Sequence, residues 1–401
     1  MQIVFTSWWW PYPVTNGSKI RIYNLLRHLA AAHDVTLLSF AEADEATPEQ
    51  IAHMRTFCQR VEVVPKPTYQ PGGMRAMLGY FSRWPRSLVD TYSPEMAARV
   101  EQAGAGADLI IASQMGTLRY LDVMPHLPAI LEELEVTLFY NQLERAQGTG
   151  GRLRAQLTVS KVVNAVRTAH RRGAAITVVS ESEQGRIRRI APPGARIEVI
   201  ANGVDTSANQ PGTIEPVPNS LIYAGAVTYD ANYHAVAFFI REVLPLIRQR
   251  VPEARFSVTG GTGSIDVRDL AAAPGVQFTG YLPDVATAIQ SSWITVVPLQ
   301  DGGGTRLKIL ESMALGTPVI STGKGAEGLD LCPGEDLLIA DEPQALADAV
   351  CNLLGDPALR ARLAAAGRKT VEHNYDWRMI GQQLVTLAES VVRERAVAHG
   401  R

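Results

Sequence analysis

Cysteine is scarce in this sequence. The 401 residues include three, Cys58, Cys332 and Cys351, which are far apart and form no CxxC pair. This spacing argues against a disulfide framework and against a cysteine-based zinc site. It is typical of a chain that works in a reducing compartment.

Long apolar runs are also missing. No uninterrupted apolar stretch approaches the roughly 18 residues that a membrane-spanning helix needs. The first residues, MQIVFTS, lack the basic segment and apolar run of a signal peptide and predict a β-strand. We therefore expect a cytoplasmic protein that is soluble or, at most, peripheral at the inner face of the membrane.

Charge of one sign is not in excess either. The 38 Lys and Arg residues against 40 Asp and Glu residues give a formal charge of −2. This balance excludes a chain that is basic throughout, although it allows a local basic face. With 46% hydrophobic and 19% charged residues the composition is that of a globular protein. Its length predicts two domains, at one per roughly 100–200 residues.

Short β-branched runs alternate with longer stretches of helical period, such as 19–32 and 233–250. This alternation predicts parallel sheets with right-handed crossovers, and hence an α/β fold of two doubly wound, Rossmann-like domains. Ligands of such domains bind at the carboxyl ends of the strands, so a cleft between the domains is the expected site. The expected strands are 2–7, 35–40, 60–64, 109–112, 130–131, 176–180, 196–200, 220–224, 255–259, 276–279, 294–298 and 318–322.

A candidate linker lies at 210–219, where QPGTIEPVPN holds three prolines and a glycine. It separates an N-terminal domain, 1–209, from a C-terminal domain, 220–376. The last stretch, 377–398, has apolar residues at helical spacing. We expect a closing helix there, and one interpretation is that it crosses back to the first domain.

The segment with the most chemistry is 301–316, DGGGTRLKILESMALG. A glycine-rich turn that enters a helix presents unpaired N–H groups at the positive end of the helix dipole, which suits a phosphate. Arg306 and Lys308 add two cations there. Glu311 lies about one and a half turns further on and could accept from the hydroxyls of a ribose. The alternative is a surface i,i+3 pair of Lys308 with Glu311. The expected buried stripe of this helix is Leu307, Leu310 and Met313 or Ala314.

Other cofactor signatures are incomplete. TGGTGSID at 259–266 lacks the third glycine of GxGxxG, and no Walker lysine is followed by Ser or Thr. The eight histidines form no zinc-type cluster. We therefore expect no metal and no resident cofactor.

Several motifs together resemble the retaining, family-4 type of GT-B glycosyltransferases. These are NGVD at 202–205, FTGY at 278–281, GGGTRLKILESMALGTPV at 302–319 and GKGAEG at 323–328, with Asn16 and Gly17 after the first strand. Each motif is modest, but their order over nearly the whole chain is specific. The resemblance implies a GT-B fold, a nucleotide-diphosphate sugar donor in the second domain and a sugar, lipid-linked or small-molecule acceptor in the first.

Carried onto this sequence, the resemblance implies that Glu311 holds the ribose hydroxyls and that Gly280 and Tyr281 flank the base. The glycine turn that approaches the donor corresponds to Asn16 and Gly17. The residues implied around the diphosphate are Gly303, Gly304, Thr305, Arg306, Leu307 and Lys308.

Three positions depart from the family. An acidic residue often precedes Glu311 by eight positions, and here that residue is Gly303. The loop after the first strand of the second domain, 225–232, starts at Gly225 and has no basic residue, so Arg306 and Lys308 are the available substitutes. The usual histidine of the first domain is missing from ILEELEV at 130–136. Glu133 and Glu135 are its polar replacements, which share one face if the segment is a strand. The alternative is a solvated acidic loop.

Two features of the first domain concern the acceptor. Residues 145–196 contain eleven Lys or Arg and two acids, a net charge of +9. Within them, 152–172 is a basic amphipathic helix in our interpretation, either a contact for an anionic membrane or an ordinary solvated face. Trp8, Trp9 and Trp10 form either an apolar wall for an acceptor or core packing. The basic segment has no interleaved aromatic residues, which argues against nucleic acid as a partner.

The sequence thus predicts a retaining glycosyltransferase of polysaccharide, glycan or glycoconjugate biosynthesis, with Arg306, Lys308, Glu133 and Glu135 as catalytic candidates. Two alternatives stay open: a sugar-nucleotide epimerase on the same frame, and a nucleotide-sugar binding protein that has lost catalysis. An NAD oxidoreductase is more remote, because no dinucleotide fingerprint is complete.

Overall fold

The computed structural model describes residues 1–212, 214–302 and 304–398. Contacts divide the chain into two compact units, Met1–Ala201 with Arg378–Arg401, and Asn202–Trp377. The predicted linker at 210–219 runs into the first strand of the second unit, which starts at Val217. The two units are described separately below.

The first unit has a parallel sheet of seven strands in the described residues, in the order β3-β2-β1-β4-β5-β6-β7. Every strand predicted for this part of the sequence is present, within a few residues at each end. The strands are β1 (Gln2–Ser7), β2 (Asp34–Ala41), β3 (Arg60–Pro65), β4 (Leu109–Ser113), β5 (Ala129–Glu132), β6 (Ala175–Val178) and β7 (Ile197–Val199).

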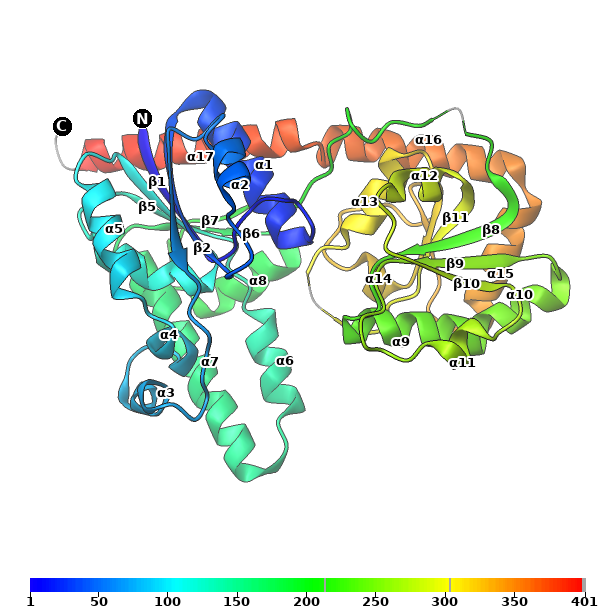
Figure 1. The fold of residues 1–401 in the computed structure, drawn as a ribbon, viewed down its shortest axis with the longest axis horizontal. Helices are drawn as coiled ribbons and strands as arrows, with labels where there is room; N and C mark the ends of the chain where they lie inside the picture. Colours follow the sequence, from blue (N-terminus) through cyan, green and yellow to red (C-terminus); the bar gives the residue numbers. More distant parts are fainter. Residues whose placement is uncertain (213, 303, 399–401) are drawn as a thin grey trace. The chain divides into compact units, whose positions relative to one another are not determined.

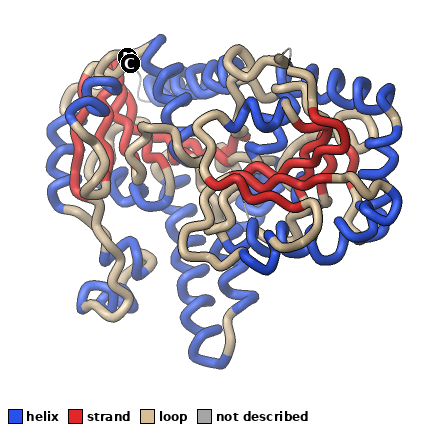
Figure 2. The backbone as a smooth tube through the Cα atoms, turned by 45° about the vertical axis from the view of Figure 1, so that its right-hand side comes forward, coloured by secondary structure: helices blue, strands red, loops and turns tan. Residues whose placement is uncertain are grey.

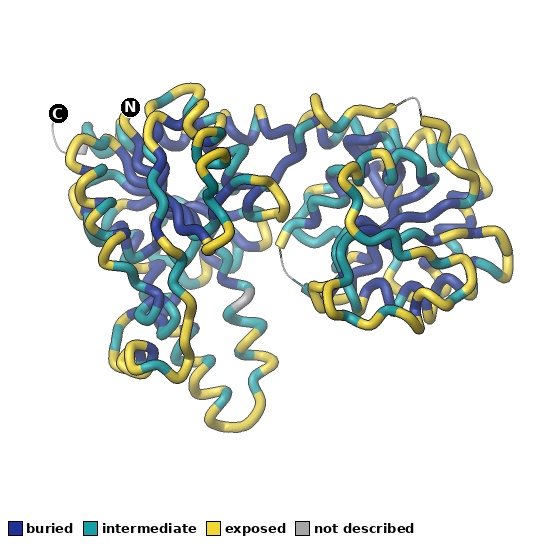
Figure 3. Tube along the Cα trace, viewed as in Figure 1, coloured by how far each residue is buried: buried dark blue, intermediate teal, exposed yellow. Residues whose placement is uncertain are grey.

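Helices cover this sheet, and its central strands β1 and β4 are buried throughout except for Gln2 (Figure 3). The closing helix is attached to the unit: the Arg196 guanidinium donates to Ser390 Oγ at 2.8 Å. The helices are α1 (Gly17–Ala32), α2 (Pro48–Met54), α3 (Met74–Leu78), η1 (Gly79–Phe81), α4 (Arg86–Asp90), α5 (Pro94–Gly104), η2 (Met115–Asp122), α6 (Thr137–Arg145), α7 (Gly148–Arg171), α8 (Glu181–Ile190) and α17 (Trp377–Ala398).

The second unit has a parallel sheet of six strands in the described residues, in the order β10-β9-β8-β11-β12-β13 (Figure 2). The two-residue strand β13 is an addition to the predicted set. The strands are β8 (Val217–Ala224), β9 (Arg255–Thr259), β10 (Val276–Gly280), β11 (Ser292–Val297), β12 (Val319–Ser321) and β13 (Leu338–Ile339).

The predicted helix 233–250 is interrupted. It consists of α9, a π-helical turn η3 and α10, and Pro245 at the start of α10 cannot donate a helical N–H, which breaks the regular pattern there. The helices of this unit are α9 (Asp230–Phe238), η3 (Phe239–Val243), α10 (Leu244–Arg250), α11 (Arg268–Ala271), α12 (Val285–Gln290), α13 (Leu307–Ala314), α14 (Gly323–Ala326), α15 (Pro343–Gly355) and α16 (Pro357–Asn374).

Both sheets reverse their strand order once. The reversal lies between β1 and β4 in the first unit and between β8 and β11 in the second. At such a point the two loops leave the carboxyl ends of adjacent strands in opposite directions, which opens a binding crevice in doubly wound sheets. The residues that follow these four strands are therefore the ones that matter for function.

Candidate functional site

The carboxyl end of β11 leads into the glycine-rich turn and α13. The turn needs glycine at two described positions, since Gly302 has φ 103° and Gly304 has φ 77°. Gly303, a predicted donor-binding residue, lies outside the described residues. Helix α13 begins at Leu307 with Arg306 as its N-cap.

Lys308 crosses from α13 to the loop that follows β8. Its Nζ lies 3.4 Å from Asn232 Oδ1 and 3.8 Å from the centroid of the Tyr223 ring. A Cβ atom on Gly225 would lie 2.7 Å from this Nζ, so the ammonium group contacts the backbone of that loop. The loop lacks the basic residues of the family, and Lys308 supplies a cation there from another element.

Burial dominates the electrostatics of Lys308. Its removal from water, and secondarily the nearby charge of Arg306, lower the pKa of Lys308 to about 7, against a weaker opposing effect of Glu311. Within the described residues no carboxylate forms an ion pair with Lys308. The polar partner is Asn232, which is oriented by the Tyr223 hydroxyl at 2.6 Å and the Ala226 carbonyl at 2.7 Å.

Arg306 and Glu311 flank this lysine. The Arg306 side chain is buried, and its Nη1 donates to the Gly304 carbonyl at 2.8 Å, which braces the turn. Burial raises the pKa of Glu311, and the charge of Lys308 opposes the shift. In the described chain Lys308 and Glu311 form no ion pair, so the surface i,i+3 pair considered as an alternative is not formed. The arrangement is a buried cation beside a helix N-terminus, which favours an anionic ligand.

The remaining predicted donor residues of this unit are less enclosed. Thr305 and Leu307 are half-buried, and Tyr281 is 77% exposed beyond Gly280 at the end of β10. The predicted buried stripe was wrong for Leu307: the buried side chains of α13 are Ile309, Leu310, Ser312, Met313 and Ala314. Leu307 is the first residue of α13, ahead of the buried side chains, which begin at Ile309.

At the carboxyl end of β5 in the first unit, a buried carboxylate is ion-paired. Glu132 Oε1 lies 2.7 Å from Arg21 Nε, and its Oε2 accepts from Ser113 Oγ at 2.6 Å. Arg21 also donates to the Ala201 carbonyl at 2.9 Å. Sequence reasoning missed this cluster, because its members are up to 180 residues apart.

Glu133 and Glu135 do not share a strand face, so that prediction was wrong. Strand β5 ends at Glu132, and Glu133 has φ 55°, a left-handed conformation that directs the chain out of the sheet. Its backbone N–H donates to Thr177 Oγ1 at 3.1 Å. Glu135 is half-buried in the connection to α6. The alternative of a fully solvated acidic loop does not hold either, since Glu133 is also half-buried.

Gln114 holds the Glu133 carboxylate. Its Nε2 donates to Glu133 Oε2 at 2.8 Å, and its own φ is 69°. Burial and the charge of Glu132 raise the pKa of Glu133 to about 7, although Arg21 and the Gln114 bond oppose the shift. Backbone strain of this kind clusters at functional sites, so Gln114 and Glu133 are candidates for one. Gln114 was also missed, although a polar residue directly after β4 is a usable signal.

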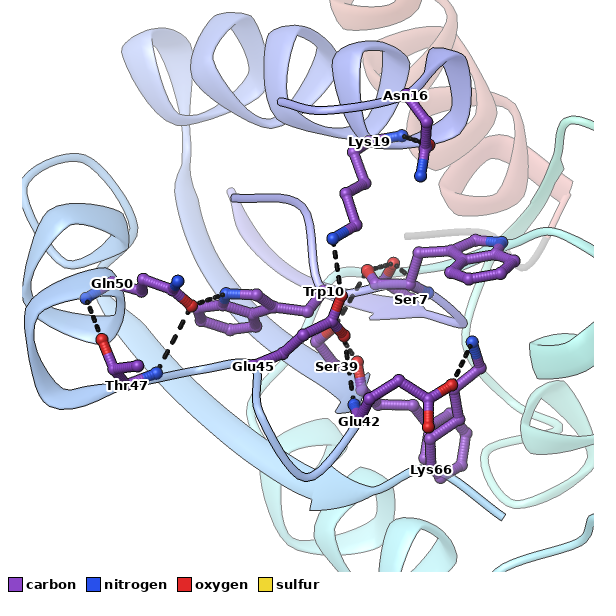
Figure 4. A network of polar contacts seen from close by, with 12 residues as sticks. Ser7, Trp10, Asn16, Lys19, Ser39, Glu42, Glu45, Thr47, Gln50 and Lys66 are labelled. Carbon is purple, nitrogen blue, oxygen red and sulfur yellow. Dashed lines mark hydrogen bonds and ion pairs between the residues drawn. The ribbon is translucent and has the colours of Figure 1, made fainter. Parts of the chain in front are cut away.

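Asn16 and Gly17 lie at the start of α1 (Figure 4). Asn16 is exposed, and its Oδ1 accepts from the Lys19 N–H at 3.0 Å, so its side chain serves as the N-cap. Lys19 Nζ is ion-paired with Glu45 at 2.5 Å. The Asn16 cap explains why α1 starts at Gly17, which is itself exposed.

The three tryptophans divide between the two interpretations. Trp10 is fully buried and donates from Nε1 to Gln50 Oε1 at 3.0 Å, which is core packing (Figure 4). Trp8 is half-buried and packs on Phe40, with ring centroids 5.1 Å apart. Trp9 is half-buried, with Lys66 Nζ 3.3 Å from the centroid of its ring. The interpretation as an acceptor wall therefore stays open for Trp8 and Trp9 and not for Trp10.

The predicted basic helix is present as α7, but its C-terminal half packs into the core of the first unit. Val162 and Val166 are buried in the first core, and Lys161 is buried as well. Arg152 and Arg154 are exposed near the start of the helix, with Leu153 between them at 72% exposure. The stretch 152–172 thus has one exposed end and one packed end.

Neither a metal site nor a membrane span is found in the described part of the chain. No group of three or more His, Cys, Asp or Glu side chains is placed to hold a metal ion. None of the helices combines the length and the apolar composition needed to cross a bilayer. The three cysteines are free.

Known proteins resemble both halves of the chain. Residues 15–208 match the family described as Glycosyltransferase Family 4, and residues 218–356 match the family described as Glycosyl transferases group 1. The phosphatidyl-myo-inositol mannosyltransferase of Mycobacterium tuberculosis H37Rv is 27% identical over 227 residues, which are 53% of this chain and 59% of that protein. The glycogen synthase of M. tuberculosis CDC 1551 is 28% identical over 240 residues, 55% of this chain and 56% of that one. The chain thus spans less than two thirds of the length of these curated relatives.

Solved structures share the fold. Sucrose-phosphate synthase from Thermosynechococcus elongatus has a TM-score of 0.70 at 19% identity, over 98% of this chain and 100% of that one. Anabaena Alr3699/HepE in complex with UDP and glucose has a TM-score of 0.65 at 17% identity, over 97% and 100%. The two family matches cover most of the sequence, and both sheets have the topology that the fold requires. The chain therefore belongs to the group 1, family 4 glycosyltransferases and has the GT-B fold.

Proposed function

We propose that the chain transfers a hexosyl group from a nucleotide-diphosphate sugar to a hydroxyl acceptor, with retention of anomeric configuration. The observation that carries the proposal is Lys308, a half-buried cation that contacts an amide oxygen and an aromatic ring at the reversal point of the second sheet. Removing an ammonium group from water without a carboxylate partner is costly, and a diphosphate would provide the missing negative charge.

The donor binds to the second unit in this proposal. The N–H groups at the start of α13, together with Arg306 and Lys308, hold the diphosphate and stabilise the charge that develops when it departs. They accelerate transfer only to the extent that they bind this developing charge better than the intact donor. Glu311 accepts from the ribose hydroxyls, as the family resemblance implies. No metal is part of the proposal, because the two side chains already supply positive charge.

The acceptor binds to the first unit. Positive charge grows on the sugar ring as the bond to the diphosphate breaks, and an ionised Glu133 held by Gln114 would stabilise it. The departing phosphate takes the proton of the acceptor hydroxyl, so no protein nucleophile is needed. Names among the relatives and similar structures, such as phosphatidyl-myo-inositol mannosyltransferase and a glycosyltransferase involved in lipopolysaccharide biosynthesis, support an acceptor with a lipid part. A peripheral membrane contact through 152–172 is consistent with such an acceptor.

A thermal-shift screen with UDP-, GDP-, dTDP- and ADP-sugars tests the donor, because a ligand that binds the folded chain raises its melting temperature. We expect one nucleotide class to stabilise the chain. Lys308→Met should abolish the shift, and Lys369→Met, which changes an exposed lysine of α16, should not. Donor release that depends on an added acceptor would then establish transfer.

Other results would favour the competing functions. Conversion of the donor sugar without any acceptor would indicate an epimerase. A shift with neither transfer nor hydrolysis would indicate a binding protein. No shift with any nucleotide sugar would contradict the proposal.

A further inference from the structure

The connection from β3 to α5 presents unusually large apolar side chains to solvent. In α3, Met74 is 80% exposed, Met77 50% and Leu78 60%, and in η1 Phe81 is 93% exposed. Large apolar side chains are commonly exposed singly, but four within eight residues form a patch. Such a patch indicates a surface that contacts a membrane or another protein.

This patch is held in place by polar contacts behind it. Lys161 of α7 donates from Nζ to the carbonyl oxygens of Gly79 at 2.5 Å and Tyr80 at 3.1 Å. Arg86 donates from Nε to the Ala76 carbonyl at 3.0 Å, and its guanidinium lies 4.2 Å from the centroid of the Tyr80 ring. Buried backbone and side-chain groups therefore anchor α3 and η1, and the apolar side chains point outward from an ordered base.

The exposed end of α7 lies at the same end of the first unit. Figures 1 and 2 show α3 and the α6–α7 turn both extending from the same side of the seven-stranded sheet. Leu153, 72% exposed, lies there between Arg152 and Arg154. The first turns of α7 therefore add a second exposed apolar side chain with basic neighbours to this end of the unit.

The two sequence stretches that hold the patch and the exposed end of α7 are basic. No Asp or Glu occurs between Glu62 and Asp90, or between Glu144 and Glu181. Acidic residues outside the two stretches neutralise part of this charge: Asp122 pairs with Arg83 and Arg172, and Glu42 pairs with Lys66. Their basic residues are Lys66, Arg75, Arg83, Arg86, Arg145, Arg152, Arg154, Lys161, Arg167, Arg171 and Arg172.

We propose that α3 and η1 dock the first unit on an anionic lipid bilayer, with Met77, Leu78 and Phe81 in the interfacial layer. A bilayer with anionic headgroups offers an apolar phase and negative charge together, which is what this patch and its basic surroundings match. A folded protein partner would need a complementary face that is both apolar and acidic. The inference rests on the peripheral membrane contact proposed above for 152–172. It assigns the apolar part of that contact to α3 and η1.

Vesicle flotation of the full chain tests this assignment. The probes are vesicles of phosphatidylcholine alone and of phosphatidylcholine mixed equally with phosphatidylglycerol. We expect the protein to float with the anionic vesicles and to be released by high salt. The double variant Leu78→Ser/Phe81→Ser should lose at least about tenfold in partitioning, since each side chain loses its apolar burial. The matched control is Val397→Ser, at a residue 76% exposed in α17, and it should bind like the original chain.

The outcomes separate this inference from the proposals above. If Leu78→Ser/Phe81→Ser binds normally and Arg152→Glu/Arg154→Glu does not, the contact lies on α7 and the inference is wrong. If the original chain binds neither vesicle, or is instead captured by a soluble protein partner, both membrane statements fail. Each variant must keep its nucleotide-induced thermal shift, which tests the donor proposal alone and also confirms folding.

Discussion

Two half-buried side chains of opposite charge, one in each unit, have pKa values displaced to about 7. Burial raises the pKa of Glu133 at the end of β5, and burial lowers that of Lys308 in α13. Glu132, next to the former, is in contrast ion-paired with Arg21. A buried charge with an opposite charge in contact holds the fold together. One that contacts only dipoles and rings is available for a ligand.

The largest effect is expected on the free energy of unfolding, when the ion pair of Arg21 with Glu132 is broken. Arg21→Met leaves the Glu132 carboxylate buried without its cation, so we expect the free energy of unfolding to fall by about 3–5 kcal/mol. Urea denaturation measures the change. Arg27→Met, at an exposed position of the same helix, should change it little.

The double variant Arg21→Met/Glu132→Leu removes both charges and should recover part of the loss. If Arg21→Met left the free energy of unfolding unchanged, the Arg21–Glu132 pair would not be structural. The distinction between ion-paired charges that hold the fold and unpaired charges that await a ligand would then fail.

For the charge that awaits a ligand, Lys308→Met should leave the unfolding free energy nearly unchanged or increase it. It should lower kcat/KM for transfer by about 10²–10³, or about 2.7–4 kcal/mol, because it removes a group that stabilises the departing diphosphate. Arg306→Ala should have an effect of the same order. Lys369→Met serves as the control, and normal kcat/KM in both site variants would refute their assignment.

The two displaced pKa values predict a bell-shaped pH profile. Lys308 must be protonated to bind the diphosphate, so kcat/KM should fall as pH rises above about 7, by about tenfold per unit. Glu133 must be ionised to stabilise the sugar cation, so kcat/KM should also fall as pH drops below about 7.

Single variants assign each side of this profile. Glu133→Gln should lower the rate and remove the acidic limb, whereas Lys308→Met should remove the alkaline limb. At saturating donor the alkaline limb of kcat should move to higher pH, since a bound diphosphate stabilises the ammonium. A profile that is flat from pH 6 to 8 would contradict both roles.

A smaller effect is expected from Gly225→Ala. The new Cβ would lie 2.7 Å from Lys308 Nζ, and the backbone there has φ 152°, so the lysine must move. We expect donor affinity to fall by about tenfold, or about 1.4 kcal/mol. Calorimetric titration measures it. Gly355→Ala is the control, because a Cβ on Gly355 would meet no atom within 4 Å.

The sequence was a good guide to the sheets and to the donor segment, because both depend on local patterns. Buried parallel strands are continuous apolar runs, and a glycine turn before a helix is visible within 16 residues. Arg306 and Lys308 were found in this way, and Lys308 reaches the loop at Gly225 whose missing charge the sequence had indicated.

The first unit was harder to predict because its site depends on distant contacts. The bond of Arg21 to Glu132 joins residues 111 apart, and nothing near either residue announces the other. The left-handed turn at Glu133 displaced it from the expected strand face. The apolar patch at α3 and η1 was not distinguished either, since a sequence does not show which apolar side chains the core leaves outside.

Proton uptake on nucleotide binding tests the central claim most directly. Calorimetric titration of the full chain with its preferred nucleoside diphosphate at pH 8, in two buffers of different ionisation enthalpy, measures the number of protons taken up. If the diphosphate binds against Lys308, the chain should take up most of one proton, and Lys308→Met should take up almost none. Tight binding by the original chain without proton uptake would contradict the account.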